Sequence, residues 1–380
     1  QANTTGANNT AVGYQALDAN TTANNNTAIG RSALGANTTG AQNTAVGRGS
    51  MVTNTTGMNN TAVGYQALED NTTGGNNAAF GREALYKNTE GTLNTACGTY
   101  TLYENTTGIE NTAVGYVALE KNTASYNTAV GSRALDVNTT GESNVALGYQ
   151  ALTSNTTAHN NTAIGNGAMA ANTTGTSNTA VGVNALDANT TASNATAVGF
   201  GALGANQTGV LNTAVGTAAL DANTTGGNNS AFGVNSLGAN ITADGNSAFG
   251  STTLSNNTTG AGNTAVGNLA LRDNTTGSNN TAIGNDALLV NNGSHNTAVG
   301  LNSAETNDSG NNNTTMGVNS FRLNTSGSGN TALGRDCLED NQTADNNTGV
   351  GFQTLQKNTT GTQNVAVGAF ALDANTTASH

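Results

Sequence analysis

The groups in this sequence that could do chemistry are Asn side chains in Asn-x-Thr and Asn-x-Ser triplets, the acceptors of N-linked sugars. One such Asn recurs about every 17 residues, from Asn3 to Asn375, and it usually opens a triplet. It also persists where the triplet is broken, at Asn88, Asn122 and Asn291. We therefore favour a structural column of Asn side chains, with glycans on some of them as the alternative. The candidate glycan sites are Asn20, Asn37, Asn54, Asn71 and Asn105.

The other reactive residues form no catalytic or metal-binding pattern. Cys97 and Cys337 are far apart in the sequence, and the 3 His residues stand in separate segments. These are His159, His295 and His380. A metal site needs several such ligands at close spacing, and the Gly-x-Gly-x-x-Gly match at 199–204 lacks the strand and helix of a dinucleotide site. The sequence therefore predicts no catalytic residue, no metal, no cofactor and no enzyme activity.

Composition excludes several classes of protein. The net charge is −12 with only 10 Lys and Arg residues, so we expect no nucleic-acid partner. No apolar run approaches the ~18 residues of a membrane-spanning helix. The chain of 380 residues has 50 Gly, no Pro and no Trp, and only 8% of its residues are charged. Too few large apolar residues are present for an ordinary globular core, and disordered chains usually contain more Pro and more charge.

A fixed repeat organises the whole sequence. The motif N-T-A-V-G ends at Gly13, Gly30 and Gly47 and continues to Gly368, with 22 such glycines in all. Nineteen of the 21 intervals are 17 residues and two are 16. We number the repeat from this motif, so that the consensus is N1-T2-A3-V4-G5-x-x-A8-L9-x-x-N12-T13-T14-G15-x-x. So strict a period predicts one continuous array over residues 1–380.

The pattern within the repeat predicts which positions face inward. Position 4 is always apolar, position 9 is almost always Leu, and position 2 accepts Val in place of Thr. Because side chains alternate along a strand, we expect positions 2, 4 and 9 to form the core. The small residues at positions 3 and 8 would then face outward, either for close packing with another chain or because the strand face is crowded. The predicted core includes Val12, Leu17, Ile29, Leu34, Val46, Val63 and Leu68.

Seventeen residues are enough for one closed circuit of two or three short strands, at ~3.3 Å per residue. Frequent Gly and Thr disfavour helices. We therefore predict an all-β fold, a parallel β-solenoid of about 22 coils with one coil per repeat. Stacking would place equal residues in columns, in which Asn side chains bond between coils and Gly at position 5 adopts a positive φ or lies close to the next backbone. The predicted column residues are Asn3, Asn20, Asn37, Asn54, Asn71, Asn9, Asn26, Asn43, Gly13, Gly30 and Gly47.

The segments Asn9–Leu17 and Asn60–Leu68, each N-T-A-V-G-Y-Q-A-L, resemble two kinds of repeat array. One is the head of YadA-like trimeric autotransporter adhesins, and the other is found in bacterial and phage tail-fibre-like proteins. The first resemblance implies a left-handed solenoid, trimers and binding to host surfaces. Both imply an extracellular or cell-surface location. The 17-residue period is longer than that of the usual adhesin head.

Together these observations predict a structural, extracellular fibre or filament subunit. Its main partner would be itself, by end-to-end stacking or by lateral association, including trimers. Both ends of the chain are in register with the repeat, so we expect a segment of a longer fibre or a subunit that stacks. The alternative is an adhesin or tail-fibre module that binds surface carbohydrate or protein. Ice binding through the Thr column at position 13 is a minor alternative.

Four Tyr residues bear on the carbohydrate alternative. Tyr14, Tyr65, Tyr116 and Tyr149 all occupy repeat position 6. Exposed Tyr rings can stack on sugars or on protein partners. Scattered Tyr residues are more often plain surface residues of a turn, which is the interpretation that we favour.

Overall fold

The computed structural model describes residues 3–379, and within them the fold is a parallel β-solenoid with 22 short strands. The chain divides into two compact units, Gln1–Thr191 and Ala192–His380. The strands of the first unit are β1 (Thr10–Val12), β2 (Thr27–Ile29), β3 (Thr44–Val46), β4 (Thr61–Val63), β5 (Ala78–Phe80), β6 (Thr95–Cys97), β7 (Thr112–Val114), β8 (Thr128–Val130), β9 (Val145–Leu147), β10 (Thr162–Ile164) and β11 (Thr179–Val181). Those of the second are β12 (Thr196–Val198), β13 (Thr213–Val215), β14 (Ser230–Phe232), β15 (Ser247–Phe249), β16 (Thr264–Val266), β17 (Thr281–Ile283), β18 (Thr297–Val299), β19 (Thr314–Met316), β20 (Thr331–Leu333), β21 (Thr348–Val350) and β22 (Val365–Val367).

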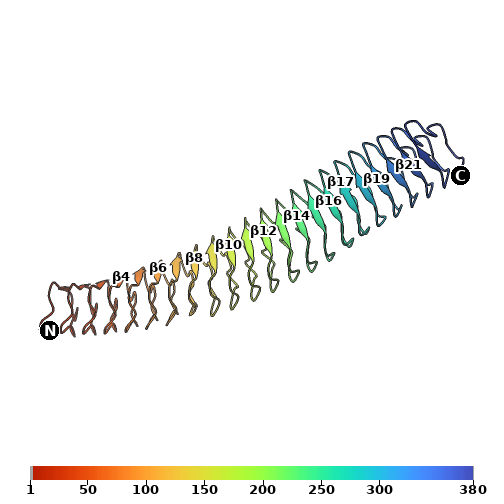
Figure 1. Cartoon of the computed structure of the whole chain (residues 1–380). Coiled ribbons are helices and arrows are strands. Elements are labelled where there is room, and N and C mark those ends of the chain that lie inside the picture. Colours follow the sequence, from red (N-terminus) through yellow and green to blue (C-terminus); the bar gives the residue numbers. More distant parts are fainter. Residues whose placement is uncertain (1–2, 380) are drawn as a thin grey trace. The chain divides into compact units, whose positions relative to one another are not determined.

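Within each unit, every strand pairs in parallel with the strand of the next coil. Thr27 faces Thr44 and Ile29 faces Val46, so that equal repeat positions are always opposite. The same register holds in the second unit, where Phe232 faces Phe249. In Figure 1, β4, β6 and β8 follow one another in this order along the first unit, and β14, β16 and β17 do so along the second. The predicted all-β solenoid with one coil per repeat is confirmed.

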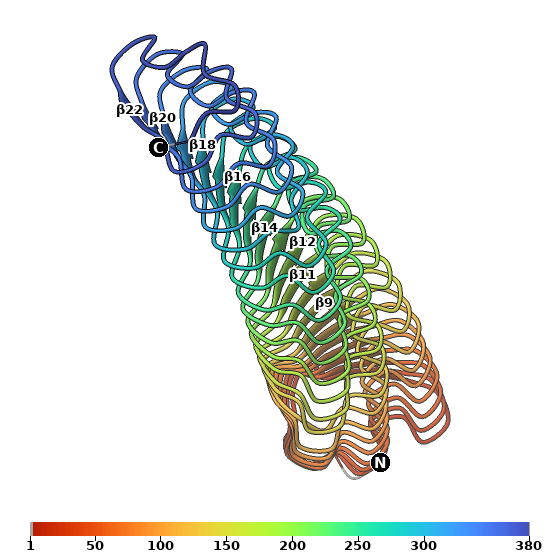
Figure 2. The same ribbon diagram turned by 90° about the vertical axis from the view of Figure 1, so that its right-hand side faces the viewer.

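Each coil has one regular strand, at positions 2–4, and the other positions form turns. The expectation of two or three strands per coil was therefore wrong. The turns are nevertheless bonded from coil to coil. The Leu34 amide donates to the Ser50 carbonyl at 3.1 Å, and the Thr38 amide donates to the Thr55 carbonyl at 3.0 Å. Figure 2 shows that the turns of successive coils follow the same path within each unit.

The core is made by positions 3, 8 and 9. Leu34 and Leu68 are fully buried and Leu17 is nearly so, as predicted. Ala28 and Ala45 at position 3 are also fully buried, together with most residues of position 8. Burial of one Leu side chain stabilises a fold by roughly 1.5–3 kcal/mol, so the Leu column supplies much of the apolar stabilisation.

The predicted orientation of the strand was wrong. Val12 is 58% exposed and Ile29 is 40% exposed, while Val46 and Val63 are half-buried. Positions 2 and 4 therefore face solvent, and the small residues at positions 3 and 8 face the interior. In every described strand after β1, the middle residue is the buried one.

The reason is that the space between positions 3 and 8 is too narrow for larger side chains. At Gly349, which takes position 3 in its coil, an added Cβ would lie 2.7 Å from the Sγ of Cys337 at position 8 of the preceding coil. Elsewhere the Thr315 hydroxyl lies 2.7 Å from that of Ser303, again position 3 against position 8. Positions 3 and 8 thus share one limited space, which Ala fills on both sides. Position 3 is accordingly Ala in 20 of the 22 coils, with Thr315 and Gly349 as the exceptions.

Gly at position 5 is required for two reasons. Gly13 and Gly30 have φ of 132° and Gly47 has φ of 138°, a region that favours glycine. An added Cβ on Gly47 would also lie 2.2 Å from the carbonyl oxygen of Gly64 in the next coil. Both predicted causes, a positive φ and close backbone approach, are confirmed.

Residues other than glycine also adopt the left-handed conformation in most coils. Asn25, Ser32 and Leu34, at positions 17, 7 and 9, have φ of 58°, 59° and 50°. This conformation costs roughly 1–2 kcal/mol for a residue with a Cβ. An isolated coil would gain too little to offset this cost, so its shape depends on stacking against its neighbours.

We expect Gly64→Ala to lower the free energy of unfolding by about 2–4 kcal/mol. Gly64 has φ of 146°, and an added Cβ would lie 2.2 Å from the Gly81 carbonyl oxygen. Urea unfolding followed by circular dichroism measures the loss. The matched control is Gly35→Ala at position 10, where Ala170 occurs naturally and an added Cβ would lie 3.3 Å from its nearest neighbour, the Ser32 carbonyl oxygen. Equal losses in both variants would contradict this explanation of the invariant glycine.

Candidate interaction surfaces

The Asn residues at position 12 form a hydrogen-bonded column inside the coils. The Asn37 Nδ2 donates to the Gly40 carbonyl at 2.9 Å and to the Asn20 Oδ1 at 3.2 Å. The Asn54 Nδ2 then donates to the Asn37 Oδ1 at 2.9 Å. Asn20, Asn37, Asn54 and Asn71 are fully buried, whereas Asn3 in the first coil is exposed. The predicted Asn ladder is confirmed, and its bonds also reach a turn carbonyl; among the described residues of the column, the Asn105 Oδ1 is the one buried oxygen without a partner.

The Asn residues at position 1 form a second column. The Asn26 Nδ2 donates to the Gly40 carbonyl at the far end of the same repeat at 3.0 Å, and its Oδ1 accepts from the Asn43 amide of the next repeat at 2.9 Å. In the first coil, the Asn9 Oδ1 accepts from the Asn26 amide at 2.9 Å. The position 15 carbonyl, as at Gly40, therefore accepts from both columns and joins them.

The structure argues against the five candidate glycan sites. Asn20, Asn37, Asn54, Asn71 and Asn105 have no exposed surface. The Asn105 Nδ2 donates to the Asn88 Oδ1 at 3.0 Å and to the Gly108 carbonyl at 3.1 Å, as its equivalents do. A sugar would replace one of the two hydrogens on this nitrogen, so at least one of these bonds would be lost, and the sugar would have no room inside the coil.

The outer side of the strands forms what we call the sheet face, defined by the side chains of positions 2 and 4. Position 2 is mostly Thr, position 4 is always apolar, and neither is charged in any coil. Ile29, Phe249 and Ile283 are each about 40% exposed, and the rings of Phe232 and Phe249 stack with centroids 5.0 Å apart. The sequence pattern showed this apolar row, but we had assigned it to the core.

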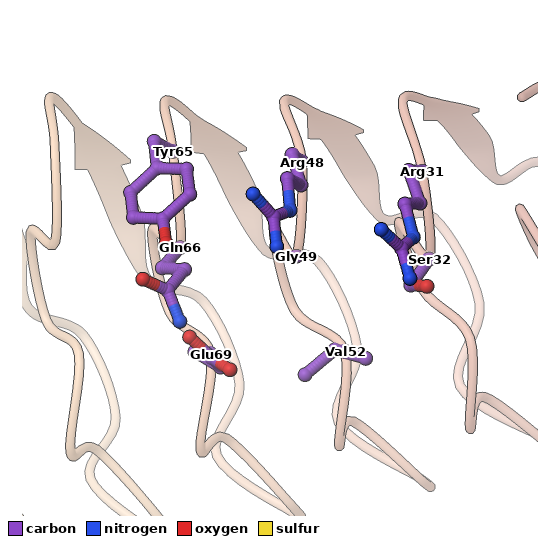
Figure 3. A pocket seen from close by; sticks show the side chains of 8 residues that line it. All are labelled: Arg31, Ser32, Arg48, Gly49, Val52, Tyr65, Gln66 and Glu69. Carbon is purple, nitrogen blue, oxygen red and sulfur yellow. The ribbon is translucent and has the colours of Figure 1, made fainter.

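The first unit also has an aromatic and charged surface on its turns, at positions 6, 7 and 10. The Arg82 guanidinium lies over the Tyr65 ring at 5.9 Å and over the Tyr100 ring at 5.4 Å. Figure 3 shows Tyr65 near Arg48 and Arg31 of the preceding coils, around a shallow pocket. These contacts hold the Tyr rings in place by cation–π attraction.

A larger groove lies further along the same surface, with a volume of about 480 Å³. Its walls are Glu83, Tyr100, Tyr103, Tyr116, Val117, Glu120, Arg133 and Asp136. The Tyr103 ring stacks on Tyr86 with centroids 5.0 Å apart. Burial raises the pKa of Glu120, and the neighbouring Asp136 carboxylate raises it further. Burial also raises the pKa of Asp136. The groove combines fixed aromatic rings with carboxyl groups that retain protons to higher pH than free ones.

The remaining candidates do not come together. Cys97 is exposed on the sheet face, whereas Cys337 is buried, and burial raises the pKa of its thiol to about 12. The His159 Nδ1 accepts a bond from the Glu142 amide at 3.0 Å, and His380 lies outside the described residues. Within residues 3–379 there is no group of three or more His, Cys, Asp or Glu that could hold a metal ion. In the same range we find no helix with the length and apolar character needed to cross a membrane.

The Thr column at position 13 uses its hydroxyl groups within the array. The Thr38 Oγ1 donates to the Thr55 carbonyl at 3.1 Å, and the Thr55 Oγ1 donates to the Thr72 carbonyl at 3.1 Å. These hydroxyls bond the next coil, so this column presents fewer free donors than its sequence suggests.

Comparison with known proteins assigns the chain to no family. No protein-family model matches the chain, and no curated protein matches it significantly. The functional argument therefore depends on the surfaces described above.

We expect Asn54→Ala to lower the free energy of unfolding by about 2–4 kcal/mol, because it leaves buried groups of neighbouring residues unbonded. The Asn71 Nδ2 would lose its acceptor at 2.7 Å, and the Asn37 Oδ1 would lose its donor. Asn166→Ala is the control, because Asn166 is exposed at position 6, where Ala369 occurs naturally. Urea unfolding measures both variants. A cost for Asn54→Ala no larger than that of the control would refute the role of the column.

Proposed function

We propose that this chain is a structural protein that assembles with copies of itself through the sheet face. The proposal depends on the apolar row at position 4 of the sheet face. This row contains no charged residue in any coil, and its side chains are half-buried or exposed. Exposed apolar surface of this extent marks an interaction site on soluble proteins.

A second copy is the occupant that fits the sheet face best. The strands repeat at ~4.8 Å, and a partner must offer side chains at the same spacing along its whole length. Another copy of this chain offers the same Thr and apolar rows. Eleven strands in each unit's described part, β1–β11 and β12–β22, provide several such rows. Stable interfaces bury roughly 800 Å² per partner, an area that rows of this length can supply.

The proposal includes an extracellular or cell-surface location and a role that is not catalytic. Its support is the resemblance of Asn9–Leu17 and Asn60–Leu68 to adhesin-head and tail-fibre repeats. In such a protein, turn residues vary freely while stacking residues stay fixed. The wide variation at positions 6, 7, 10 and 11 fits this division.

The proposal predicts that Phe80→Lys combined with Val114→Lys abolishes self-association. Both side chains are exposed on the sheet face, at 43% and 37%. Two buried, unpaired charges at an interface would weaken association by a factor of at least 100. Sedimentation analysis of the wild-type chain and the variant measures this change, with circular dichroism to verify the fold.

The control pair is Ala36→Lys with Val137→Lys, which adds the same charge at position 11, where Lys87 and Lys121 occur. It should associate like the wild type. If the wild-type chain stays monomeric even at about 100 μM, roughly 100 times the concentration of an ordinary assay, the proposal is refuted. Thermal hysteresis from such a monomer would instead indicate that the chain binds ice.

A second candidate function is recognition of a neutral saccharide by the groove of the first unit. Tyr100, Tyr103 and Tyr116 supply rings for stacking on sugar rings, and Glu120 and Asp136 can bond hydroxyl groups. Three acidic groups against one Arg make an anionic sugar less favourable.

For this second candidate we expect Tyr116→Ala to weaken binding of neutral oligosaccharides about tenfold, as loss of one aromatic contact does. Tyr149→Ala is the control, because Tyr149 is an exposed residue at the same repeat position but does not line the groove. Screening on a glycan array, followed by calorimetry, measures both. Absence of any neutral ligand, or equal losses in the two variants, would exclude the groove as the site.

A further inference from the structure

A second set of Asn-x-Thr/Ser triplets begins at position 17, where the side chain is exposed. Position 17 precedes position 1, which is Asn in every coil except that of Ala195, and the Thr or Ser of position 2 completes the triplet. The side chains at this position lie outside both Asn columns. The exposed Asn residues that open such triplets are Asn8, Asn25, Asn59, Asn160, Asn194, Asn228, Asn279, Asn312 and Asn346.

The local geometry turns these side chains towards solvent. Asn25, Asn59 and Asn160 have φ of 58°, 60° and 59°, a left-handed turn that Asn tolerates better than most residues. The backbone is held independently of the side chain, since the Asn25 amide donates to the Ala7 carbonyl at 3.0 Å. The Asn8 Nδ2 donates to the Asn25 Oδ1 at 3.2 Å, but this bond is exposed and lies outside both Asn columns. A group attached to the side-chain nitrogen would therefore leave the two columns intact.

We propose that the position 17 Asn residues, and not those of position 12 in the stacked coils, are acceptors of N-linked sugars. In the transfer, a bond forms between the Asn Nδ2 and the sugar C1. The bond from C1 to the phosphate of an activated lipid-linked saccharide breaks, and the phosphate leaves with the electron pair. The amide nitrogen gives its proton to a base of the transferase. No electron is gained or lost.

The two sets of triplets differ in what a sugar would do to the fold. At position 12, the Asn37 nitrogen already donates to the Gly40 carbonyl and the Asn20 Oδ1, so a sugar there prevents the coil from closing. At position 17, a sugar projects from a turn. Only the triplets that begin at position 17 are compatible with a stacked array, whether the sugar is added before or after the chain folds.

The longest run of coils without such an acceptor lies between Asn59 and Asn160. Between Asn76 and Ser143, position 17 opens no triplet. These are the coils that carry Tyr100, Tyr103 and Tyr116 of the groove. Sugars on the other coils would leave this aromatic surface uncovered.

Two single substitutions provide a matched test. Asn76 is exposed at position 17, but Ala78 breaks its triplet, and Ala78→Thr restores the consensus residue. Asn88 is buried at position 12, but Glu90 breaks its triplet, and Glu90→Thr likewise restores the consensus residue. Each variant adds one triplet without departing from the repeat, so both should fold.

The test uses the full chain, secreted from a eukaryotic cell line by an added signal peptide. This inference rests on the proposed extracellular location but not on self-association, so the two can fail separately. The folded protein is purified and treated with peptide N-glycosidase in ¹⁸O-water, which converts each occupied Asn to labelled Asp. Mass spectrometry then maps the label.

We expect label at the position 17 triplets of the wild type, a new label at Asn76 in Ala78→Thr, and none at Asn88 in Glu90→Thr. An unlabelled wild-type chain would overturn the inference. So would label at Asn88, or an Asn76 that stays unmodified while its triplet is complete. Self-association is measured separately on the deglycosylated protein.

Discussion

The rest of this structure depends on the requirement that each buried carboxamide be bonded to the next coil. Position 12 supplies the clearest case, since the Nδ2 of Asn37 bonds both its own turn and the neighbouring Asn. Both bonds persist in the shorter coil after Asn291. In the shorter coil after Asn122, the Nδ2 of that residue bonds the Ala124 carbonyl at 2.8 Å but not the preceding Asn, and the Asn105 Oδ1 is left buried without a partner. The column resumes in the next coil, where the Asn138 Nδ2 donates to the Asn122 Oδ1 at 2.7 Å.

A polar interior leaves little space for apolar side chains, and this decides what the surface looks like. With Asn at two positions and Ala at two more, Leu at position 9 is the main large apolar group inside. The other apolar position, position 4, is left outside on a regular strand. The proposed assembly follows from this distribution. The apolar side chains of position 4 can add to stability by burial only when another molecule covers them.

Much of the fold could be predicted from the sequence, because a strict period fixes the architecture. The invariant Asn37 and Gly30 columns were assigned to stacking and the nearly invariant Leu34 column to the core, and the structure places all three there. The strand orientation was wrong, because an apolar residue that never varies looks the same in sequence whether it packs inside a coil or against another chain. Each coil has one 3-residue strand, so too few residues alternate to show which side of the strand faces inward. The Val residues at position 2, Val145 and Val365, favoured the wrong assignment. The left-handed conformation of Leu34 had no local signal, since it arises only in the stacked array. The groove was missed because its Tyr and acidic residues come from different positions of successive coils.

The Asn column also gives the array a polarity. In every bond of the type made by Asn37 and Asn54, the nitrogen belongs to the later coil and the oxygen to the earlier one. The carboxamide dipoles therefore all point the same way, and the two sides of a coil are chemically different. A coil added upside down would bring oxygen against oxygen. Whole repeats can be gained or lost by duplication or deletion, but only when they keep the direction of the chain.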